Sequence, residues 1–300
     1  MSASPQWTAR PERGSAWLLR LMIGLTLRTG RPVARAVLWP ITLYFWLATR
    51  HARTDSRRYL SRLWQRPARW HETLRHFHAF SSTVLDRVYL LGGRFDELDV
   101  RLHGQQHVDR ALGDGGGGAF LTGGHMGSFE ALRACGRQQP GLQVTMAMYE
   151  DNAQMIGRFL RELDPTLAAD IIALGRIDSM LRIQQRMQAG ACVGFLADRA
   201  FAGDQTIDVP FLGQPAPFPV GVFRLAAVTR RPMLLMVGLY RGGRRYDVVI
   251  EPLADFREVE REHRAAAIDE AVRRFASRLE HYCRDAPYNW FNFYDFWHPQ

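Results

Sequence analysis

Short apolar runs alternate with amphipathic, helix-period segments along most of this chain, and this alternation strongly limits its possible folds. The predicted strands cover residues 95–103, 119–122, 142–148, 171–174, 191–196, 233–239 and 246–250. The predicted helices cover residues 50–69, 70–91, 129–135, 153–163, 178–188, 220–228 and 264–282. Strands that alternate with helices predict an α/β fold: a single layered domain with a mixed central sheet flanked by helices.

The positive charge of the chain is concentrated at its N-terminus. Residues 1–70 carry thirteen arginines and two acids, a net charge of +11, whereas residues 71–300 have a net charge of −2. Two apolar runs, 16–27 and 36–49, lie within the basic segment. The longer run spans about 21 Å as a helix, which is short of the ~30 Å hydrocarbon core of a bilayer.

Apolar helices rimmed by arginine and tryptophan are typical of segments that lie at the interface of an anionic bilayer. We therefore predict a membrane-anchoring helical segment over residues 1–70 and a second domain over residues 71–300. The basic segment predicts attachment to the cytoplasmic face of an inner membrane. Three alternatives stay open: a single kinked span over residues 16–49, a buried pair of core helices, and a nucleic-acid-binding segment.

The residue inventory excludes several classes of enzyme. The chain has 39 arginines and no lysine, so a Walker A loop and a pyridoxal or other Schiff-base site are excluded. The glycine run at 115–118 precedes its strand, whereas a dinucleotide-binding loop follows one. The chain has no Gly-x-Ser-x-Gly elbow, and its three widely spaced cysteines match neither a disulfide framework nor a metal site. We expect no metal and no cofactor.

The sequence His125-Met-Gly-Ser-Phe-Glu130 lies at a predicted strand–turn–helix junction. Ser128 is placed to cap the helix that follows, which puts His125 on the loop and Glu130 on the first helical turn. A contact between the two side chains would fix the imidazole tautomer and stabilise the imidazolium ion. Gly123 and Gly124 would permit close approach of a substrate. A structural His–Glu pair is the alternative interpretation.

Asp198 and Arg199 directly follow the predicted strand at 191–196, just as His125 follows the strand at 119–122. Sites in α/β folds form at the carboxyl ends of strands, so both loops are candidates for one site. An ordinary ion pair on a surface turn is the alternative for Asp198 and Arg199.

The order of these motifs resembles that of the bacterial lipid A biosynthesis (lauroyl/myristoyl-type) acyltransferases, within the lysophospholipid acyltransferase superfamily. The similar segments are the His-x4-Glu motif and residues 194–199, 209–213, 221–226 and 289–297. An N-terminal membrane segment is also typical of that family. The aromatic Asn289-Trp-Phe-Asn-Phe ending resembles in addition an aryl-polyene-associated branch of the superfamily.

The resemblance implies transfer of a fatty acyl group from an acyl-carrier-protein or acyl-CoA thioester to a hydroxyl or amine of a lipid or glycolipid. His125 would be the general base and Glu130 its orienter. Backbone amides of residues 123–127 or the side chain of Arg199 would stabilise the oxyanion, and Gly123, Gly124, Ser128 and Asp198 would shape the substrate site. The alternative is a non-catalytic peripheral membrane-binding protein.

One turn departs from the family pattern. Where the family has a Tyr-Arg-Pro-like turn, this chain has Tyr149-Glu-Asp-Asn152. The two acids would repel a phosphate at short range, although Arg158 on the next predicted helix could compensate. With Tyr149 and Arg158 as substrate-binding residues, we expect an acceptor that is less phosphorylated than a lipid A precursor.

Overall fold

The computed structural model describes residues 30–113, 117–131, 135, 143–149, 171–175, 178–200 and 203–298. Several predictions from the sequence lie outside these residues: the apolar run at 16–27, the acidic turn residues 150–152 and the helix at 153–163, which includes Arg158. Nothing in the structure tests them.

The predicted central sheet is present and has seven strands in the order β1-β9-β8-β2-β5-β3-β4. The strands are β1 (Asp99–His103), β2 (Phe120–Gly123), β3 (Val144–Tyr149), β4 (Ile171–Leu174), β5 (Cys192–Leu196), β8 (Pro232–Tyr240) and β9 (Arg245–Asp255). β8 and β9 pair in antiparallel orientation, and every other neighbouring pair is parallel. The prediction of a mixed sheet in an α/β fold is therefore confirmed.

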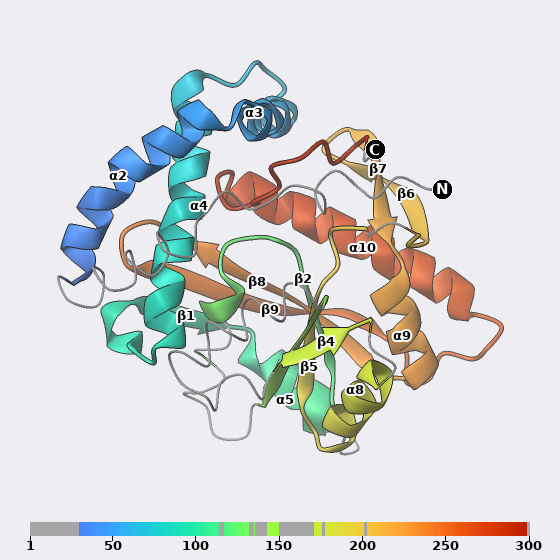
Figure 1. Cartoon of the computed structure of the whole chain (residues 1–300). Helices are drawn as coiled ribbons and strands as arrows, with labels where there is room; N and C mark the ends of the chain where they lie inside the picture. The colour runs from blue at the N-terminus through green and yellow to red at the C-terminus, as the bar shows by residue number, and fades with distance from the viewer. Residues whose placement is uncertain are drawn as a thin grey trace.

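Helices cover both faces of the sheet (Figure 1). β8 is buried along its whole length, and its side chains alternate between two cores. Leu235 and Val237 belong to the core that contains α8 (Ser179–Gln188), α9 (Gly221–Thr229) and α10 (Arg264–Asp285). Leu234 and Met236 belong to the core that contains α4 (Trp70–Leu91) and α5 (Gln105–Gly113). A strand buried on both faces reads as a continuous apolar run, which is why the sequence revealed it.

The sequence did not reveal two elements, α5 and a hairpin formed by β6 (Thr206–Phe211) and β7 (Gln214–Pro219). The hairpin turns at Leu212 and Gly213, which have φ angles of 49° and 85° and so form the left-handed turn that suits a two-residue hairpin loop. Four of its twelve strand residues are proline, and proline argues against a strand because it cannot donate to the ladder. The pairing of β6 with β7 is known only from the tertiary structure, in which β6 packs against α10.

One predicted strand is shorter than expected. Residues 95–97 form a single 3₁₀ turn, η1 (Phe95–Glu97), and β1 begins only at Asp99. The sequence alternates in polarity through this stretch, but η1 has no buried side chain. β1 itself also has no fully buried side chain, so the alternation by itself did not locate the start of the strand.

Two helices precede the layered domain and pack against it: α2 (Arg31–Ala48) and α3 (Arg50–Trp64). Tyr59, Leu60 and Leu63 of α3 are fully buried in the same core as α10. α2 contributes Ala34 and Leu38, which pack with Leu85 of α4. Among the helices of the described residues, none is at once long and apolar enough to cross a membrane.

A buried ion pair fastens the start of α2 to the body. The Arg31 guanidinium donates to both carboxylate oxygens of Asp86 in α4, at 2.8 and 2.9 Å. The hydroxyl of Tyr246 in β9 donates to the same carboxylate at 2.9 Å. Both members of the pair are buried, so neither charge can be solvated if the other is lost.

We expect the substitution Arg31→Met to lower the free energy of unfolding by about 3–5 kcal/mol, because it leaves Asp86 as an uncompensated buried charge. Urea unfolding followed by far-UV circular dichroism measures this change. The matched control is Arg273→Met, which breaks the exposed pair with Asp269 in α10 and should change the free energy of unfolding far less, because water screens an exposed pair. Equal losses in the two variants would show that the buried pair does not hold α2 in place.

Candidate active site

Two loops at the carboxyl edge of the sheet carry the site. β2 and β5 are neighbouring parallel strands, and their register places Gly123 opposite Leu196. His125 and Asp198 each lie two residues beyond this pair, so the two loops bring their side chains together. The expectation that His125 and Asp198 share one edge of the sheet is confirmed.

Asp198 accepts three hydrogen bonds in a fully buried position. Its Oδ1 lies 2.7 Å from Nδ1 of His125, and its Oδ2 accepts from the backbone amide of His125 at 3.0 Å. The indole Nε1 of Trp290 donates to the same Oδ2 at 3.0 Å. A carboxylate with this many donors is fixed in orientation, and it fixes the imidazole in turn.

The electrostatics of the pair determine which imidazole nitrogen is basic. Burial alone would raise the pKa of Asp198, but the charge and hydrogen bonds of His125 and the charge of Arg199 outweigh it and lower the pKa. Asp198 is therefore ionised and can only accept, so Nδ1 of His125 carries the proton and Nε2 holds the free lone pair.

The imidazole of His125 is held in its neutral form. Burial lowers its pKa, the charges of Arg199 and Arg87 lower it further, and Asp198 opposes them. About 30% of the His125 side chain stays exposed, which leaves the ring accessible from outside. At neutral pH the ring is thus an unprotonated, oriented base.

Glu130 contacts other groups than the sequence predicted. Its Oε1 lies 2.7 Å from Nε of Arg87 in α4, and its Oε2 accepts from the Ser128 hydroxyl at 3.2 Å. The expected contact with His125 is absent between these two described residues, and Asp198 occupies the position at Nδ1. Residues 129–131 are helical, and the short helix presents Glu130 to α4. Ser128 Oγ accepts the amide of Ala131 at 3.3 Å, so the predicted helix cap is confirmed.

The backbone amides of the motif loop are occupied within the protein. Besides the amide of His125, those of Met126, Gly127 and Ser128 donate to the carbonyls of Gly124, Asn289 and Gly238, at 2.6, 2.8 and 2.7 Å. The sequence proposed the amides of residues 123–127 as oxyanion donors, and within this range those of His125, Met126 and Gly127 already have acceptors in the protein. Arg199 is the other donor that the sequence proposed.

Close packing of backbone on backbone explains the glycines of this loop. Gly127 has a φ of 63°, and a Cβ there would lie 1.8 Å from the carbonyl oxygen of Gly238. At Gly124 a Cβ would approach Cγ of Asp198 to 3.3 Å. In the structure Gly127 and Gly124 let the loop lie against β8 and Asp198, and the proposed approach of a substrate at Gly123 and Gly124 stays a prediction.

A segment near the C-terminus, residues 289–291, completes the site, and we name it the C-terminal strap. The amide of Phe291 donates to the His125 carbonyl at 2.7 Å. The side chain of Asn289 bonds both the amide and the carbonyl of Tyr240 at the end of β8. Trp290 is fully buried and reaches Asp198 through its indole. The sequence showed these aromatic residues only as part of a resemblance, because no local pattern indicates contact across such a separation.

Arg199 lies against the strap. Its Nη2 donates to the carbonyl of Phe291 at 2.8 Å, and its guanidinium lies over the ring of Tyr294, 5.4 Å from the centroid. Arg199 thus brings a positive charge to the site, which its effect on the pKa values of His125 and Asp198 also shows.

A second histidine, on α4, holds the C-terminal strap in place, and the sequence did not identify it as part of the site. His76 of α4 is fully buried, and its Nε2 donates to the carbonyl of Trp290 at 2.9 Å. Its Nδ1 therefore accepts from the Ser56 hydroxyl at 2.9 Å. Burial lowers the pKa of His76 to about 4. The nearby His78 stacks on Trp39 instead.

We expect His76 to make the fold sensitive to acid. The folded protein holds His76 neutral, so between its unfolded pKa of about 6.5 and its folded pKa of about 4 the unfolded chain binds more protons. The free energy of unfolding should therefore fall by about 3 kcal/mol as the pH falls through this window.

Urea unfolding of the wild type and of His76→Gln at several pH values between 7 and 4 measures this contribution. Glutamine can still donate to the Trp290 carbonyl but does not titrate, so its stability should depend less on pH by the stated amount. Parallel pH dependences in the two proteins would contradict the assignment.

The comparison with known families identifies the chain's relatives. The family model described as bacterial lipid A biosynthesis acyltransferase matches residues 87–298. This match covers more than two thirds of the chain, from Arg87 to the strap. The chain belongs to this family. Membership implies an acyltransferase with an acyl donor and a lipid acceptor, and it confirms the resemblance seen in the sequence. A comparison with curated proteins returned no match.

The structure of this family member gives the backbone positions of most of the remaining predicted substrate-binding residues. Gly123 ends β2, Gly124 lies between β2 and His125, and Ser128 caps the short helix. Tyr149 ends β3, at the carboxyl edge of the sheet where β2 and β5 also end. Their proposed contacts with substrate stay predictions, as does that of Arg158.

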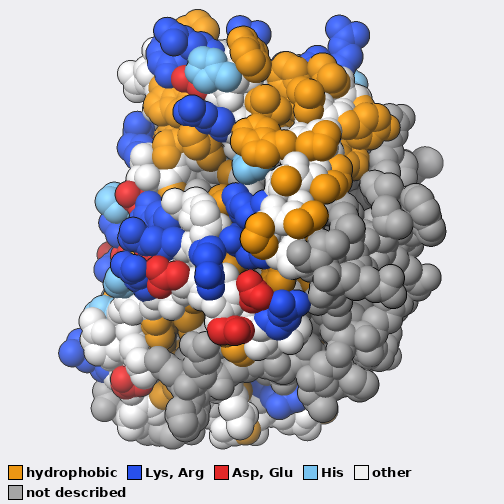
Figure 2. Space-filling model, turned by 90° about the vertical axis from the view of Figure 1, so that its left-hand side faces the viewer, with side chains coloured by type: hydrophobic (Ala, Val, Ile, Leu, Met, Phe, Trp, Pro, Cys, Tyr) orange, Lys and Arg blue, Asp and Glu red, His pale blue; other side chains and the backbone are white. Residues whose placement is uncertain are grey.

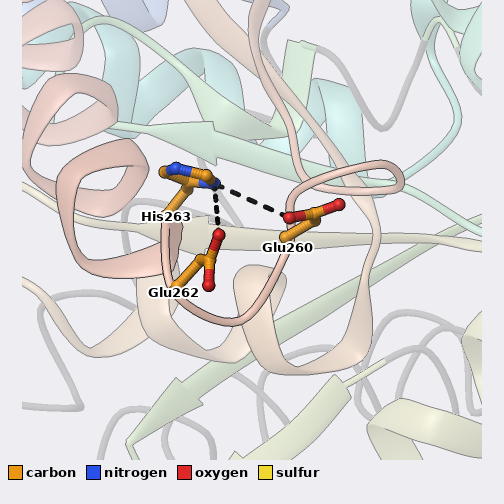
Figure 3. A group of neighbouring side chains, drawn as sticks. All are labelled: Glu260, Glu262 and His263. Atoms are coloured by element: carbon orange, nitrogen blue, oxygen red, sulfur yellow. Dashed lines mark ion pairs between the residues drawn. The ribbon is translucent and has the colours of Figure 1, made fainter.

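Three side chains in the described part of this acyltransferase lie close enough to share a metal ion: Glu260, Glu262 and His263 (Figure 3). They occupy the turn before α10, and His263 pairs weakly with the two carboxylates at 4.0 and 3.9 Å. All three are exposed, so water competes for every ligand position. The group is an ordinary charged turn and takes no part in the site.

The three cysteines of this acyltransferase are buried and unpaired. Burial raises the pKa of Cys135 to about 11 and that of Cys192 to about 12, and it also raises the pKa of Cys283. Thiols with such pKa values stay protonated at neutral pH and are poor nucleophiles. This agrees with a reaction that uses an oriented base.

Proposed function

We propose that this protein transfers a fatty acyl group from an acyl-carrier-protein or acyl-CoA thioester to a hydroxyl or amine of a lipid or glycolipid, with His125 as general base. The observation that carries the proposal is the bond between Nδ1 of His125 and the ionised Asp198, which leaves Nε2 as the base. Family membership supports acyl transfer as the reaction type.

In the proposed step, the acceptor hydroxyl gives its proton to Nε2 of His125 while its oxygen attacks the thioester carbonyl carbon. The C–S bond then breaks, and the leaving sulfur takes the proton from the imidazolium ion. Asp198 stabilises that ion through Nδ1, and base assistance of this kind contributes roughly 10²–10⁴ in rate. The charge of Arg199 is our candidate for stabilising the oxyanion, with roughly 10²–10³ in rate at stake.

Within this proposal Glu130 has a positioning role. Its ion pair with Arg87 and its bond to Ser128 hold the helix that follows His125 against α4. It also balances the charge of Arg87, which otherwise lowers the pKa of His125. Glu130 thus acts on the base through the loop and through Arg87.

The acceptor remains a proposal from the sequence alone. Glu150 and Asp151 would repel a phosphate, so we propose a neutral or weakly phosphorylated acceptor, such as the hydroxyl of a glycolipid or polyene lipid. Acylation rates with a lipid A precursor and with neutral glycolipids test this idea. A lipid A precursor that reacts faster than every neutral acceptor would contradict it.

Thioester turnover tests the function itself. Purified protein is mixed with acyl-carrier-protein or acyl-CoA donor and with bacterial lipid extract, and thiol release and new acyl lipid are measured together. Acyl lipid formed in proportion to thiol supports transfer. No turnover with either donor would favour the second candidate, a non-catalytic membrane-binding protein, which the large exposed apolar side chains of α2 support.

We propose that the protein is attached to the cytoplasmic face of an inner membrane through its basic N-terminal part. Residues 1–70 carry a net charge of +11, which favours an anionic bilayer surface. Cell fractionation of the full-length protein tests this. A shortened protein that lacks residues 1–29 but keeps the Arg31–Asp86 pair is fractionated beside it for comparison. Full-length protein recovered in the supernatant without detergent would contradict the proposal.

We expect the acid limb of the pH–rate profile to have its midpoint below pH ~6.5, the ordinary pKa of histidine. Activity needs neutral His125, and burial together with the charge of Arg199 lowers its pKa. The rate should therefore be constant near neutral pH and fall only as the pH drops through the lowered pKa. Measurement of kcat/KM against pH with a soluble donor gives the midpoint, and a midpoint above 7 would contradict the assignment.

A further inference from the structure

A groove lined by arginines lies where α2, α3 and the start of α4 meet, and we name it the basic groove. Its volume is about 730 Å³. The residues that carry the argument are Trp46, Arg50, Arg53, Arg57, Arg69 and Trp70. Among the residues that line it, all within the described part of the chain, none is acidic. Four guanidinium groups without a carboxylate among them create a strong preference for an anion.

The nearby acids are engaged elsewhere. Glu72 is buried and accepts from Arg66 at 2.6 Å and from the Arg69 amide at 2.6 Å. Asp55 is also buried and lies 3.5 Å from Arg58, which turns toward Asp295 as well. Within the described part of the chain, neither of these acids therefore balances the charges of Arg50 and Arg57.

One side of the basic groove is held rigidly. The indole of Trp46 donates to Thr73 Oγ1 at 3.0 Å. Arg53 donates to the Trp46 carbonyl at 2.9 Å, and its guanidinium lies 4.7 Å from the centre of the Trp46 ring. These contacts fix Arg53 before any ligand arrives, which lowers the entropic cost of binding.

Large exposed apolar side chains lie on α2, the helix that carries Trp46 of the basic groove, and at the groove itself. Trp39, Leu43 and Leu47 lie at intervals of four on α2 and are about half exposed, and Trp70 at the groove itself is 67% exposed. Figure 2 shows hydrophobic side chains gathered over the upper part of this surface, with arginine side chains beside them. Apolar groups next to arginines match the boundary between the headgroups and the acyl chains of a bilayer.

We propose that the basic groove binds the phosphate of an anionic phospholipid headgroup while the exposed apolar side chains of α2 and Trp70 enter the acyl boundary of the same bilayer. A free phosphate ion or an acidic protein would satisfy the arginines but would leave the apolar side chains in water. The bilayer satisfies both, because each arginine near an anionic surface adds to binding and each buried apolar side chain adds again. This binding is independent of the proposed acyl transfer.

The test uses the full-length protein and two kinds of vesicle, phosphatidylcholine alone and phosphatidylcholine mixed with phosphatidylglycerol. Binding is measured by flotation, without donor or turnover, so a failure here is distinct from a failure of the enzymatic proposal. The variant Arg50→Gln/Arg57→Gln should lose about 30-fold in its preference for the anionic vesicles. Trp70→Ala should weaken binding to both kinds of vesicle.

The matched control, Arg261→Gln/Arg274→Gln, removes two exposed charges from the other end of the molecule. Arg261 lies just before α10 and Arg274 lies within it. It should keep the wild-type preference. An unchanged preference in the groove variant, or an equal loss in the control, would overturn the proposal. If the groove variant still binds the anionic vesicles as the wild type does but no longer binds an acidic acyl carrier protein, the proposal would be overturned in favour of a protein partner. Inorganic phosphate that protects the wild type but not the groove variant against thermal unfolding, in a protein with no preference for the anionic vesicles, would show a site for the free ion and would also overturn it.

Discussion

The variant His125→Ala is expected to lose acyl transfer by about 10²–10⁴-fold while it keeps the wild-type fold. The reason is that Nε2 of His125 is the proposed base for the acceptor hydroxyl, and base assistance accounts for roughly 10²–10⁴ in rate. About 30% of the side chain is exposed, so its removal leaves no large buried cavity. Single-turnover measurement of acyl lipid formation gives the loss.

The control for this variant is His281→Ala, which removes an exposed histidine from α10. It should keep full activity and unfold at the same urea concentration as the wild type. His125→Ala removes one of the three hydrogen bonds to buried Asp198, so far-UV circular dichroism at the assay temperature checks that this variant is folded. Transfer at the wild-type rate in His125→Ala would end the proposal that this histidine is the base. The result would then favour a structural motif in a membrane-binding protein.

The variant Asp198→Asn is expected to lose about 10²–10⁴ in rate, far more than Glu130→Gln, for which we expect a loss within about tenfold. Asparagine has the shape of aspartate but not its charge, so it neither fixes the Nδ1–H tautomer of His125 nor stabilises the imidazolium ion. The carboxylate also raises the pKa of His125, so its loss should move the acid limb of the pH–rate profile to lower pH.

Glu130→Gln should show a different pattern, because Glu130 contacts Arg87 and Ser128 and not the imidazole. Its main effect should be a loss of stability measured by urea unfolding, with a smaller loss of rate. The comparison therefore separates two carboxylates that the sequence alone could not separate. If Glu130→Gln loses as much rate as Asp198→Asn with its fold intact, Glu130 is the orienter in the working enzyme.

The sequence predicted the fold well where burial leaves a periodic trace. β8 reads as an apolar run because both of its faces are covered, and α4 has the bounds that its helical period indicated. The hairpin of β6 and β7 was missed because four of its residues are proline, and its packing against α10 and the C-terminal aromatic residues is not visible in the local sequence. The local sequence pattern predicts a helix or strand when the burial of that element leaves a periodic arrangement of apolar residues within it.

The same distinction between local pattern and tertiary packing applies to the residues of the site. The sequence by itself determined that His125 and Asp198 follow strands, that Ser128 caps a helix and that the motifs resemble a family of acyltransferases. Only the tertiary structure decided that the imidazole pairs with Asp198, 73 residues away, and that Trp290 holds that carboxylate. The reason is that a strand pattern fixes which edge a loop occupies, but the order of strands in the sheet and the path of the strap determine which side chains meet there.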